Sequence, residues 1–289
     1  MVVKNKSAFP NTFENISIGI LMIATNDYLD LWKLTALDLD QFAFKKNIKK
    51  SIHLFTNKVT EAEKWASVNL KNYNLFCHYI KGWGWPEATL LRYKFITSVP
   101  KDVLEEVLIY FDSDMQIIGD FGPDLLNEIS NNLIFVVDHP GYTVGRNGII
   151  KFISFLKEPR LIGNLLRKII TKSGGMGDWE SNKVSTAYVR PDKRFRYVHG
   201  AIWGGHKEAF YKMCSELAVN VDADLNINFI AKWHDESHLN WFTSENRVTY
   251  LNTKFSNFRK YKNLSHINSY IYTRIKPKDF GRISTRNEI

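Results

Sequence analysis

Residues 107–114 read Val-Leu-Ile-Tyr-Phe-Asp-Ser-Asp, an apolar run that ends in two carboxylates two residues apart. Five consecutive large apolar or aromatic side chains predict a strand over 107–111. Because Asp112 and Asp114 follow the end of that strand, both can approach one divalent cation if the backbone bends there. Carboxylate oxygens suit Mn²⁺ or Mg²⁺, which also bind a diphosphate and offset its charge. Asp-x-Asp is equally a common way to start a turn, so the pair alone leaves both interpretations open.

The residues on either side of this run alternate short β-rich segments with helical periodicity. The alternation predicts an α/β fold with a Rossmann-like, mostly parallel sheet flanked by helices. In such sheets ligands bind at the carboxyl ends of the strands. The expected strands cover 16–24, 51–56, 75–80, 107–111, 133–137 and 197–203. The expected helices cover about 27–46, 61–68, 87–99, 208–218 and 239–246. Gly204-Gly205 predicts a turn after the last of these strands.

The composition limits the kind of protein. With 289 residues, of which 44% are hydrophobic and 24% charged, the chain can bury the core of one large α/β domain. Its two cysteines, Cys77 and Cys214, exclude a disulfide framework and lack zinc-ligand spacing, so we expect a reduced, cytoplasmic protein. Residues 1–13 read as a tail without the apolar core of a signal peptide, and the run 16–24 is too short to span a bilayer. We therefore expect no membrane anchor.

The net charge of +9 is unevenly distributed. Nine Lys or Arg against two acids between 251 and 289 give +7, and seven against one between 146 and 172 give +6. Such clusters predict basic surfaces that face polyanions or phosphates, although solvated surface explains them equally well. Because aromatic residues interleave the C-terminal cluster, a nucleic-acid-binding protein is one alternative. The basic segment 145–178 carries Gly174-Gly175-Met176-Gly177 and predicts a mobile insertion.

A second polar cluster, Trp233-His234-Asp235-Glu236-Ser237-His238, precedes a helical stretch. Ionisable side chains beside a tryptophan suit a sugar site, where carboxylates accept hydrogen bonds from hydroxyls and the aromatic face packs on ring C–H groups. His234 and His238 also have the i, i+4 spacing of a zinc helix, so a metal-dependent hydrolase is a further alternative. That motif has Glu directly after the first His, where this chain has Asp235. A plain helix start capped by Asp235 is the structural alternative.

These motifs resemble those of the retaining α-1,3-galactosyl/N-acetylgalactosaminyltransferase family, which includes the blood-group A and B enzymes. The resemblance runs from about residue 20 to 246 and is interrupted by the segment 145–178. Its markers are Ile23-Ala24-Thr25 with Tyr28, Trp85 with Arg92, Asp112-Ser113-Asp114, His139-Pro140-Gly141, Tyr188, His199-Gly200-Ala201 before Gly204-Gly205, and Trp233 to His238. The resemblance implies a GT-A-type glycosyltransferase fold. A single catalytic domain would cover 14–256, and a basic tail over 257–289 would close over the donor.

The resemblance also implies a role for each matching residue. Asp112 and Asp114 would hold Mn²⁺ or Mg²⁺, and Glu236 would be the catalytic carboxylate at the anomeric carbon. The donor would be bound by Ile23, Ala24, Thr25, Tyr28, Trp85, Arg92, Ser113, His199, Gly200, Ala201, Asp235 and Arg286. The acceptor would be contacted by His139, Trp233 and Glu236.

The implied activity is transfer of galactose, or N-acetylgalactosamine, from the UDP-sugar to a galactoside-type glycan in α-1,3 linkage with retention. In the family, His at the position of His199 goes with galactose. Two departures matter. Lys276 and Lys278 precede Arg286 at a spacing that differs from that of the family's diphosphate-binding tail, and the acceptor-facing segment has no match in 250–262. The acceptor is therefore open. Many bacterial relatives replace both metal-binding aspartates with asparagine, whereas this chain keeps them.

Overall fold

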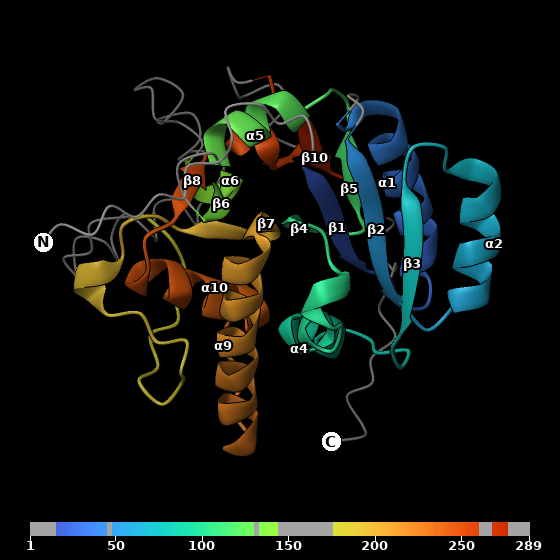
Figure 1. Ribbon diagram of the computed structural model, residues 1–289. Coiled ribbons are helices and arrows are strands. Elements are labelled where there is room, and N and C mark those ends of the chain that lie inside the picture. Colours follow the sequence, from blue (N-terminus) through green and yellow to red (C-terminus); the bar gives the residue numbers. More distant parts are fainter. Residues whose placement is uncertain (1–15, 45–47, 130–132, 144–175, 260–267, 277–289) are drawn as a thin grey trace, which may run out of the picture.

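The computed structural model describes residues 16–44, 48–129, 133–143, 176–259 and 268–276. A seven-stranded sheet lies at its centre, with the strand order β3-β2-β1-β4-β7-β6-β8 (Figure 1). The strands are β1 (Ser17–Ile23), β2 (Lys49–Thr56), β3 (Asn74–Tyr79), β4 (Val107–Phe111), β6 (Ile134–Asp138), β7 (Val198–His206) and β8 (Thr249–Leu251). All neighbours are parallel except β7, which runs antiparallel to both β4 and β6. The predicted α/β fold with a mostly parallel sheet is confirmed.

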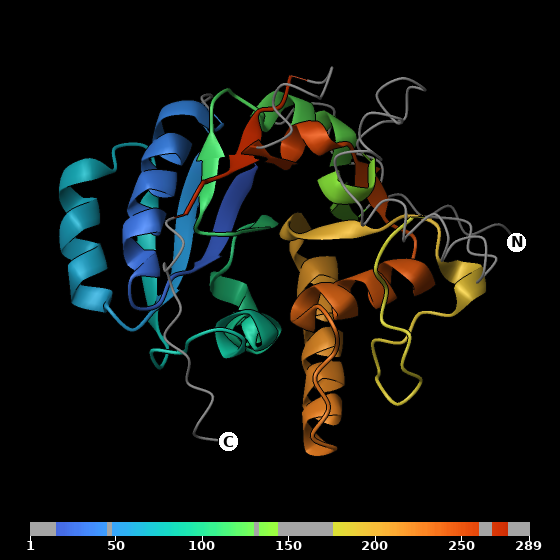
Figure 2. The same cartoon turned by 180° about the vertical axis from the view of Figure 1, so that it is seen from behind.

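Helices cover both faces of this sheet (Figures 1 and 2). Alternate residues of β1 enter two different cores, since Ile20 packs in a core with Trp32 of α1, while Leu21 packs in a core with Phe210 of α9. Strands that are buried on both faces are continuous apolar runs in the sequence. The central strands could therefore be predicted from the sequence. The helices are α1 (Tyr28–Phe42), α2 (Val59–Asn69), α3 (Glu87–Leu90), α4 (Arg92–Thr97), α5 (Gly122–Ile129), α6 (Pro140–Thr143), α9 (Lys207–Asn226) and α10 (His234–Glu245).

A second, three-stranded sheet joins the C-terminal part of the described chain to the end of β4. Its order is β5-β10-β9, formed by β5 (Met115–Ile117), β10 (Ile271–Thr273) and β9 (Asn257–Phe258). β10 is antiparallel to β5, which starts directly after Asp114. The backbone N–H of Arg274 donates a 2.7 Å hydrogen bond to the carbonyl oxygen of Asp114. The chain beyond β10 is therefore held beside the carboxylates that follow β4.

The sequence analysis was wrong at two places. Gly204-Gly205 is not a turn but part of β7, where a Cβ on Gly204 would lie 2.4 Å from the carbonyl oxygen of Leu108, and one on Gly205 2.1 Å from that of Leu133. Glycine is needed there because neighbouring backbones approach closely. The single helix expected over 87–99 is divided at Leu91 into α3 and α4.

Among the described residues, no helix combines the length and the apolar character that crossing a membrane requires. The predicted tail 1–13 and residues 145–175 of the predicted insertion lie outside the described residues.

Candidate active site

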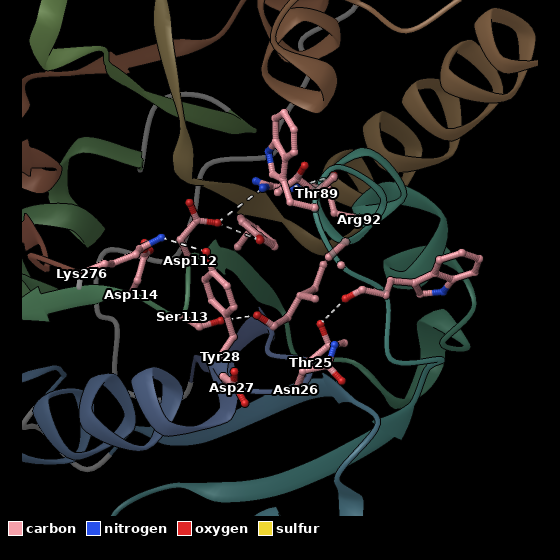
Figure 3. A pocket seen from close by; sticks show the side chains of 16 residues that line it. Thr25, Asn26, Asp27, Tyr28, Thr89, Arg92, Asp112, Ser113, Asp114 and Lys276 are labelled. Carbon is pink, nitrogen blue, oxygen red and sulfur yellow. Dashed lines mark hydrogen bonds and ion pairs between the residues drawn. The ribbon is translucent and has the colours of Figure 1, made fainter. Parts of the chain in front are cut away.

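A cavity of about 290 Å³ opens at the carboxyl ends of β1 and β4 (Figure 3). Three chain segments form it: the turn after β1, the loop and helices from Trp83 to Arg92, and the residues after β4. Lys276, just past β10, closes a fourth side. This is the edge of the sheet at which the α/β pattern predicts a ligand.

Short hydrogen bonds fix the floor of the cavity. The Ser113 hydroxyl donates to the carbonyl oxygen of Ile23, which ties the end of β4 to the end of β1. The Thr25 hydroxyl donates to the carbonyl oxygen of Trp83 at 2.6 Å, and so holds the loop that carries Trp85. Trp85 is itself 58% exposed.

Eight of the predicted donor and metal residues line the cavity: Ile23, Thr25, Tyr28, Trp85, Arg92, Asp112, Ser113 and Asp114. Ala24, predicted with them, is fully buried, does not line the cavity, and donates its backbone N–H to the carbonyl oxygen of Phe55. Arg286 and Lys278 lie outside the described residues.

The two aspartates after β4 have different surroundings. The Asp112 carboxylate accepts a 2.9 Å hydrogen bond from the Tyr110 hydroxyl and lies 3.5 Å from Nη2 of Arg92. Burial raises the pKa of Asp112 to about 6, and the nearby Asp114 carboxylate adds to the rise. Asp114 forms an ion pair with Lys276. Two carboxylates that repel one another in a partly desolvated cavity favour a cation between them.

Arg92 links the cavity to a second group of predicted residues. Its Nη1 donates to the carbonyl oxygen of Gly200 at 2.8 Å and lies 3.1 Å from the Asp235 carboxylate, while the guanidinium lies 4.4 Å above the ring of Tyr110. Burial alone would lower the pKa of Arg92, but Asp235 and the other anionic neighbours raise it above its ordinary value. Arg92 is therefore a permanent positive charge that joins α4, β4, β7 and α10.

Asp235 and Glu236 lie in the first turn of α10. Burial raises the pKa of Asp235 to about 7, against the lowering effect of Arg92. Burial also raises the pKa of Glu236 to about 8, although the Gly200 backbone N–H donates a 2.8 Å hydrogen bond to this carboxylate. Buried carboxyl groups with raised pKa values are typical of active sites.

Asn240, which the sequence analysis missed, fixes Glu236 against β7. Its side-chain amide accepts from the backbone N–H of Val198 at 2.8 Å and donates to the carbonyl oxygen of the same residue at 3.0 Å. It also donates to the carbonyl oxygen of Glu236 at 2.9 Å. An asparagine four residues after a candidate catalytic carboxylate, on the same helix face, is the only sequence signal for this contact.

His139, His199 and Glu236 form a polar cluster beyond Arg92, with one possible ligand atom of each lying within 4.8 Å of the others. The Gly141 backbone N–H donates to Nδ1 of His139 at 3.0 Å, which in the neutral ring places the proton on Nε2. His139 then offers a hydrogen-bond donor at Nε2, not the lone pair that a metal needs. The Ser256 hydroxyl lies 2.7 Å from Nδ1 of His199, and burial lowers the pKa of His199 to about 4. The cluster therefore suits binding of sugar hydroxyls beside Glu236.

Trp233, predicted to contact the acceptor, is 44% exposed at the start of α10. Its indole N–H donates a 2.9 Å hydrogen bond to the Asp178 carboxylate. The same carboxylate forms an ion pair with Lys232. Ala201, predicted to face the donor sugar, is buried in β7, and its carbonyl oxygen accepts from the backbone N–H of Asp112 at 2.9 Å.

The zinc-helix interpretation has no support among the described residues. His238 is fully buried and lies 3.7 Å from the Asp224 carboxylate, whereas the ring of His234 packs on Trp85 with 4.9 Å between the centroids. The two histidines are thus turned to different neighbours.

Known proteins are similar in sequence to this chain over most of its length. The profile described as Glycosyltransferase family 6 matches residues 161–278. The chain is 26% identical over 246 residues to the O-antigen biosynthesis glycosyltransferase WbnI of Escherichia coli, a match that covers 84% of this chain and 89% of that protein. It is 25% identical over 231 residues to globoside alpha-1,3-N-acetylgalactosaminyltransferase 1 of Mus musculus, covering 78% of this chain and 56% of the relative. It therefore spans about half the length of the mammalian relative. With its sheet, its motifs and these relatives, the chain is similar to glycosyltransferase family 6, and it is a hexosyltransferase.

Proposed function

We propose that this protein is a metal-dependent retaining glycosyltransferase that transfers galactose, or N-acetylgalactosamine, from the UDP-sugar to a galactoside-type glycan in α-1,3 linkage. The observation that carries the proposal is the position of Arg92, which contacts Asp112 on one side and Asp235 on the other. The buried Arg92 guanidinium thereby joins the cavity, where we place the nucleotide, to the residues around Glu236.

The charges in the cavity fit a diphosphate together with a cation. Asp112, Asp114 and Asp235 contribute three negative charges when ionised, and Arg92 with Lys276 contributes two positive ones. A diphosphate would add at least two more negative charges, so a divalent cation at the aspartate pair is needed to bring the site near neutrality. Asp112 and Asp114 would hold Mn²⁺ or Mg²⁺, which when bound stabilises the negative charge of the leaving diphosphate.

The donor sugar would lie between the cavity and Glu236, over the Arg92–Gly200 contact. In the reaction the acceptor oxygen forms a bond to the anomeric carbon, the bond from that carbon to the β-phosphate oxygen breaks, and UDP leaves. Retention follows from one of two routes. Either Glu236 displaces UDP and forms a covalent glycosyl intermediate, from which the acceptor oxygen displaces Glu236 while its proton passes to the diphosphate, or the acceptor attacks on the face from which UDP departs and gives its proton to the diphosphate. In the second route Glu236 stabilises the positive charge of the sugar ring.

The two relatives support the proposal on substrates. One is an O-antigen biosynthesis glycosyltransferase and the other a globoside alpha-1,3-N-acetylgalactosaminyltransferase. The proposed position of His199 beside the donor sugar favours galactose, because His at the corresponding position of the similar family goes with galactose. The nucleic-acid alternative gives no role to the buried carboxylates Asp235 and Glu236.

The test is a panel of UDP-sugars, with and without Mn²⁺, in which UDP release and transfer to simple galactosides are both measured. We expect UDP-galactose to be the preferred donor and the product to carry an α-1,3 linkage by NMR. A kcat/KM at least tenfold higher for UDP-N-acetylgalactosamine would reverse the donor assignment. Tight binding of any oligonucleotide with a steep dependence on salt, without sugar transfer, would favour the nucleic-acid alternative.

A further inference from the structure

Lys276 occupies a position in the donor cavity that its own strand imposes. β10 pairs with β5, the segment directly after Asp114, and the Arg274 side chain forms an ion pair with Asp38 of α1. Two residues further on, the Lys276 ammonium reaches the cavity wall. The placement of this lysine therefore follows from backbone pairing and not from a flexible side chain alone.

The ammonium of Lys276 contacts two residues that the proposed function gives to the donor site (Figure 3). It forms an ion pair with Oδ2 of Asp114, and it donates to the Tyr28 hydroxyl at 3.1 Å. It also lies 4.8 Å from the centre of the Tyr28 ring. The side chain of Lys276 is 32% exposed and that of Asp114 is 15% exposed, so solvent screens the ion pair only in part.

The Asp114 carboxylate cannot bind both the Lys276 ammonium and a divalent cation without a loss of binding free energy. A divalent cation held by Asp112 and Asp114 would have to displace the ammonium from Oδ2 or lie within a few ångströms of it, where the two positive charges repel. A diphosphate removes the conflict, because its oxygens can accept the ammonium while the carboxylates keep the divalent cation. Lys276 thus weakens binding of the divalent cation when no diphosphate is present. It favours binding of the cation and the diphosphate together.

We infer that Lys276 makes cation binding conditional on the nucleotide: it weakens binding of the divalent cation to the free protein and strengthens binding of the nucleotide diphosphate. The inference rests on the proposed function, since it takes Asp112 and Asp114 as the cation ligands. By thermodynamic linkage, the factor by which UDP raises the affinity for the cation equals the factor by which the cation raises the affinity for UDP. Lys276 sets part of that factor.

The test measures Mn²⁺ binding through the electron paramagnetic resonance signal of free Mn²⁺, with and without UDP, in the full-length protein. Lys276→Gln removes the charge and keeps a polar side chain of similar reach. Lys94→Gln is the matched control, because Lys94 forms a 2.9 Å ion pair with Asp222 away from the cavity. Lys276→Arg keeps the positive charge and should keep most of the linkage.

We expect Lys276→Gln to bind Mn²⁺ roughly three- to tenfold more tightly than the wild type without UDP, and to bind UDP at least about fivefold more weakly in saturating Mn²⁺. Lys94→Gln should match the wild type in both titrations. Equal or weaker Mn²⁺ binding by Lys276→Gln without UDP overturns this inference and leaves the proposed function intact. Absence of Mn²⁺ binding in every variant, even with UDP, overturns both this inference and the proposed metal dependence.

Discussion

Glu236 and Gly200 meet where α10 crosses β7, and the contact leaves no room for a side chain on the glycine. A Cβ on Gly200 would lie 3.2 Å from Cβ and 3.3 Å from Oε2 of Glu236, and 3.4 Å from Oδ2 of Asp235. The same glycine donates its N–H to Glu236 and its carbonyl oxygen accepts from Arg92. Gly200 therefore sets the positions of the Glu236 carboxylate and the Arg92 guanidinium through its backbone.

Gly200→Ala should accordingly lower kcat by about tenfold or more, because a shift of the carboxylate by a few tenths of an ångström disturbs the alignment on which transfer depends. Gly119→Ala is the control, since a Cβ there would meet the Tyr270 ring at a similar 3.3 Å outside the cavity. Steady-state transfer rates and melting temperatures of both variants would be compared. A Gly200→Ala enzyme with wild-type kcat would show that this contact does not position the catalytic carboxylate.

The raised pKa of Glu236 predicts an alkaline rate profile. Burial holds this pKa at about 8, so the carboxyl group is mostly protonated at pH 7 and ionises as the pH rises. Both proposed roles need the carboxylate, so kcat/KM should rise up to about tenfold per pH unit below 8 and level off above it. Glu236→Gln should lose roughly a hundredfold or more in kcat and lose this dependence on pH, with UDP binding retained. A profile that is flat from pH 6.5 to 8.5 in the wild type contradicts the assignment.

Removal of Arg92 should affect stability as well as activity. Arg92→Met leaves the buried carboxylate of Asp235 and the part-buried carboxylate of Asp112 without their cation, and we expect the free energy of unfolding to fall by about 3–5 kcal/mol. Arg190→Met is the comparison, because Arg190 and Asp192 form an ion pair in which both side chains are more than half exposed, and solvent can replace Arg190. Urea denaturation measures both. The explanation fails if the loss at Arg92 does not exceed the loss at Arg190.

The aspartate pair predicts a requirement for a divalent cation. Chelation should abolish transfer and Mn²⁺ should restore it, and the double variant Asp112→Asn with Asp114→Asn should lower kcat by several orders of magnitude. Asp222→Asn, which removes one partner of an exposed ion pair, is the control. Full transfer activity in excess EDTA would rule the requirement out.

A pair of histidines outside the cavity lining, His53 buried and His78 half-buried, predicts how stability depends on pH. Nε2 of His78 lies 3.0 Å from Nδ1 of His53, whose Nε2 lies 2.8 Å from the Glu105 carboxylate. Burial, with His53 beside it, lowers the pKa of His78 to about 4, so the folded state favours the neutral ring. The folded pKa lies below the unfolded value of about 6.5. The stabilisation is therefore complete above pH 6.5 and is lost as the pH falls towards 4.

His78→Asn should remove this dependence. The difference in unfolding free energy between wild type and variant should be larger at pH 7 than at pH 4.5, by about 1 to 2 kcal/mol after allowance for partial exposure of the ring. Urea midpoints across this range give the answer, and a difference that does not change with pH contradicts it.

The central strands could be predicted because burial on both faces makes each one a continuous apolar run, as in Val107–Phe111. The short strands β5, β9 and β10 could not, because two or three residues carry no periodicity and their partners lie far away in the sequence. Gly204-Gly205 misled the analysis for a related reason. Two glycines in a row read locally as a turn, whereas here they admit the carbonyl oxygens of Leu108 and Leu133.

The site shows the same division between local and distant information. The sequence placed Asp112 and Asp114 at a strand end, and the structure brings Asp112 within ion-pair distance of Arg92. The sequence alone could not predict that Asn240 bonds the backbone of Val198, 42 residues away, since that contact depends on how α10 crosses the sheet. The position of Lys276 likewise depends on the pairing of β10 with β5.

The contacts of Arg92 also bear on how the protein is made. This side chain reaches Gly200, 108 residues further along the chain, and then the carboxylate of Asp235. A chain emerging from a ribosome can pair β1 with β2 and β3 early, since these strands follow one another closely. The cavity is complete only after residue 276 has emerged, because Lys276 forms part of its lining, and Arg92 gains its partner Asp235 only once α10 is in place. Recovery of UDP binding should therefore trail recovery of helical structure during synthesis or refolding, and it reports that the whole chain has folded.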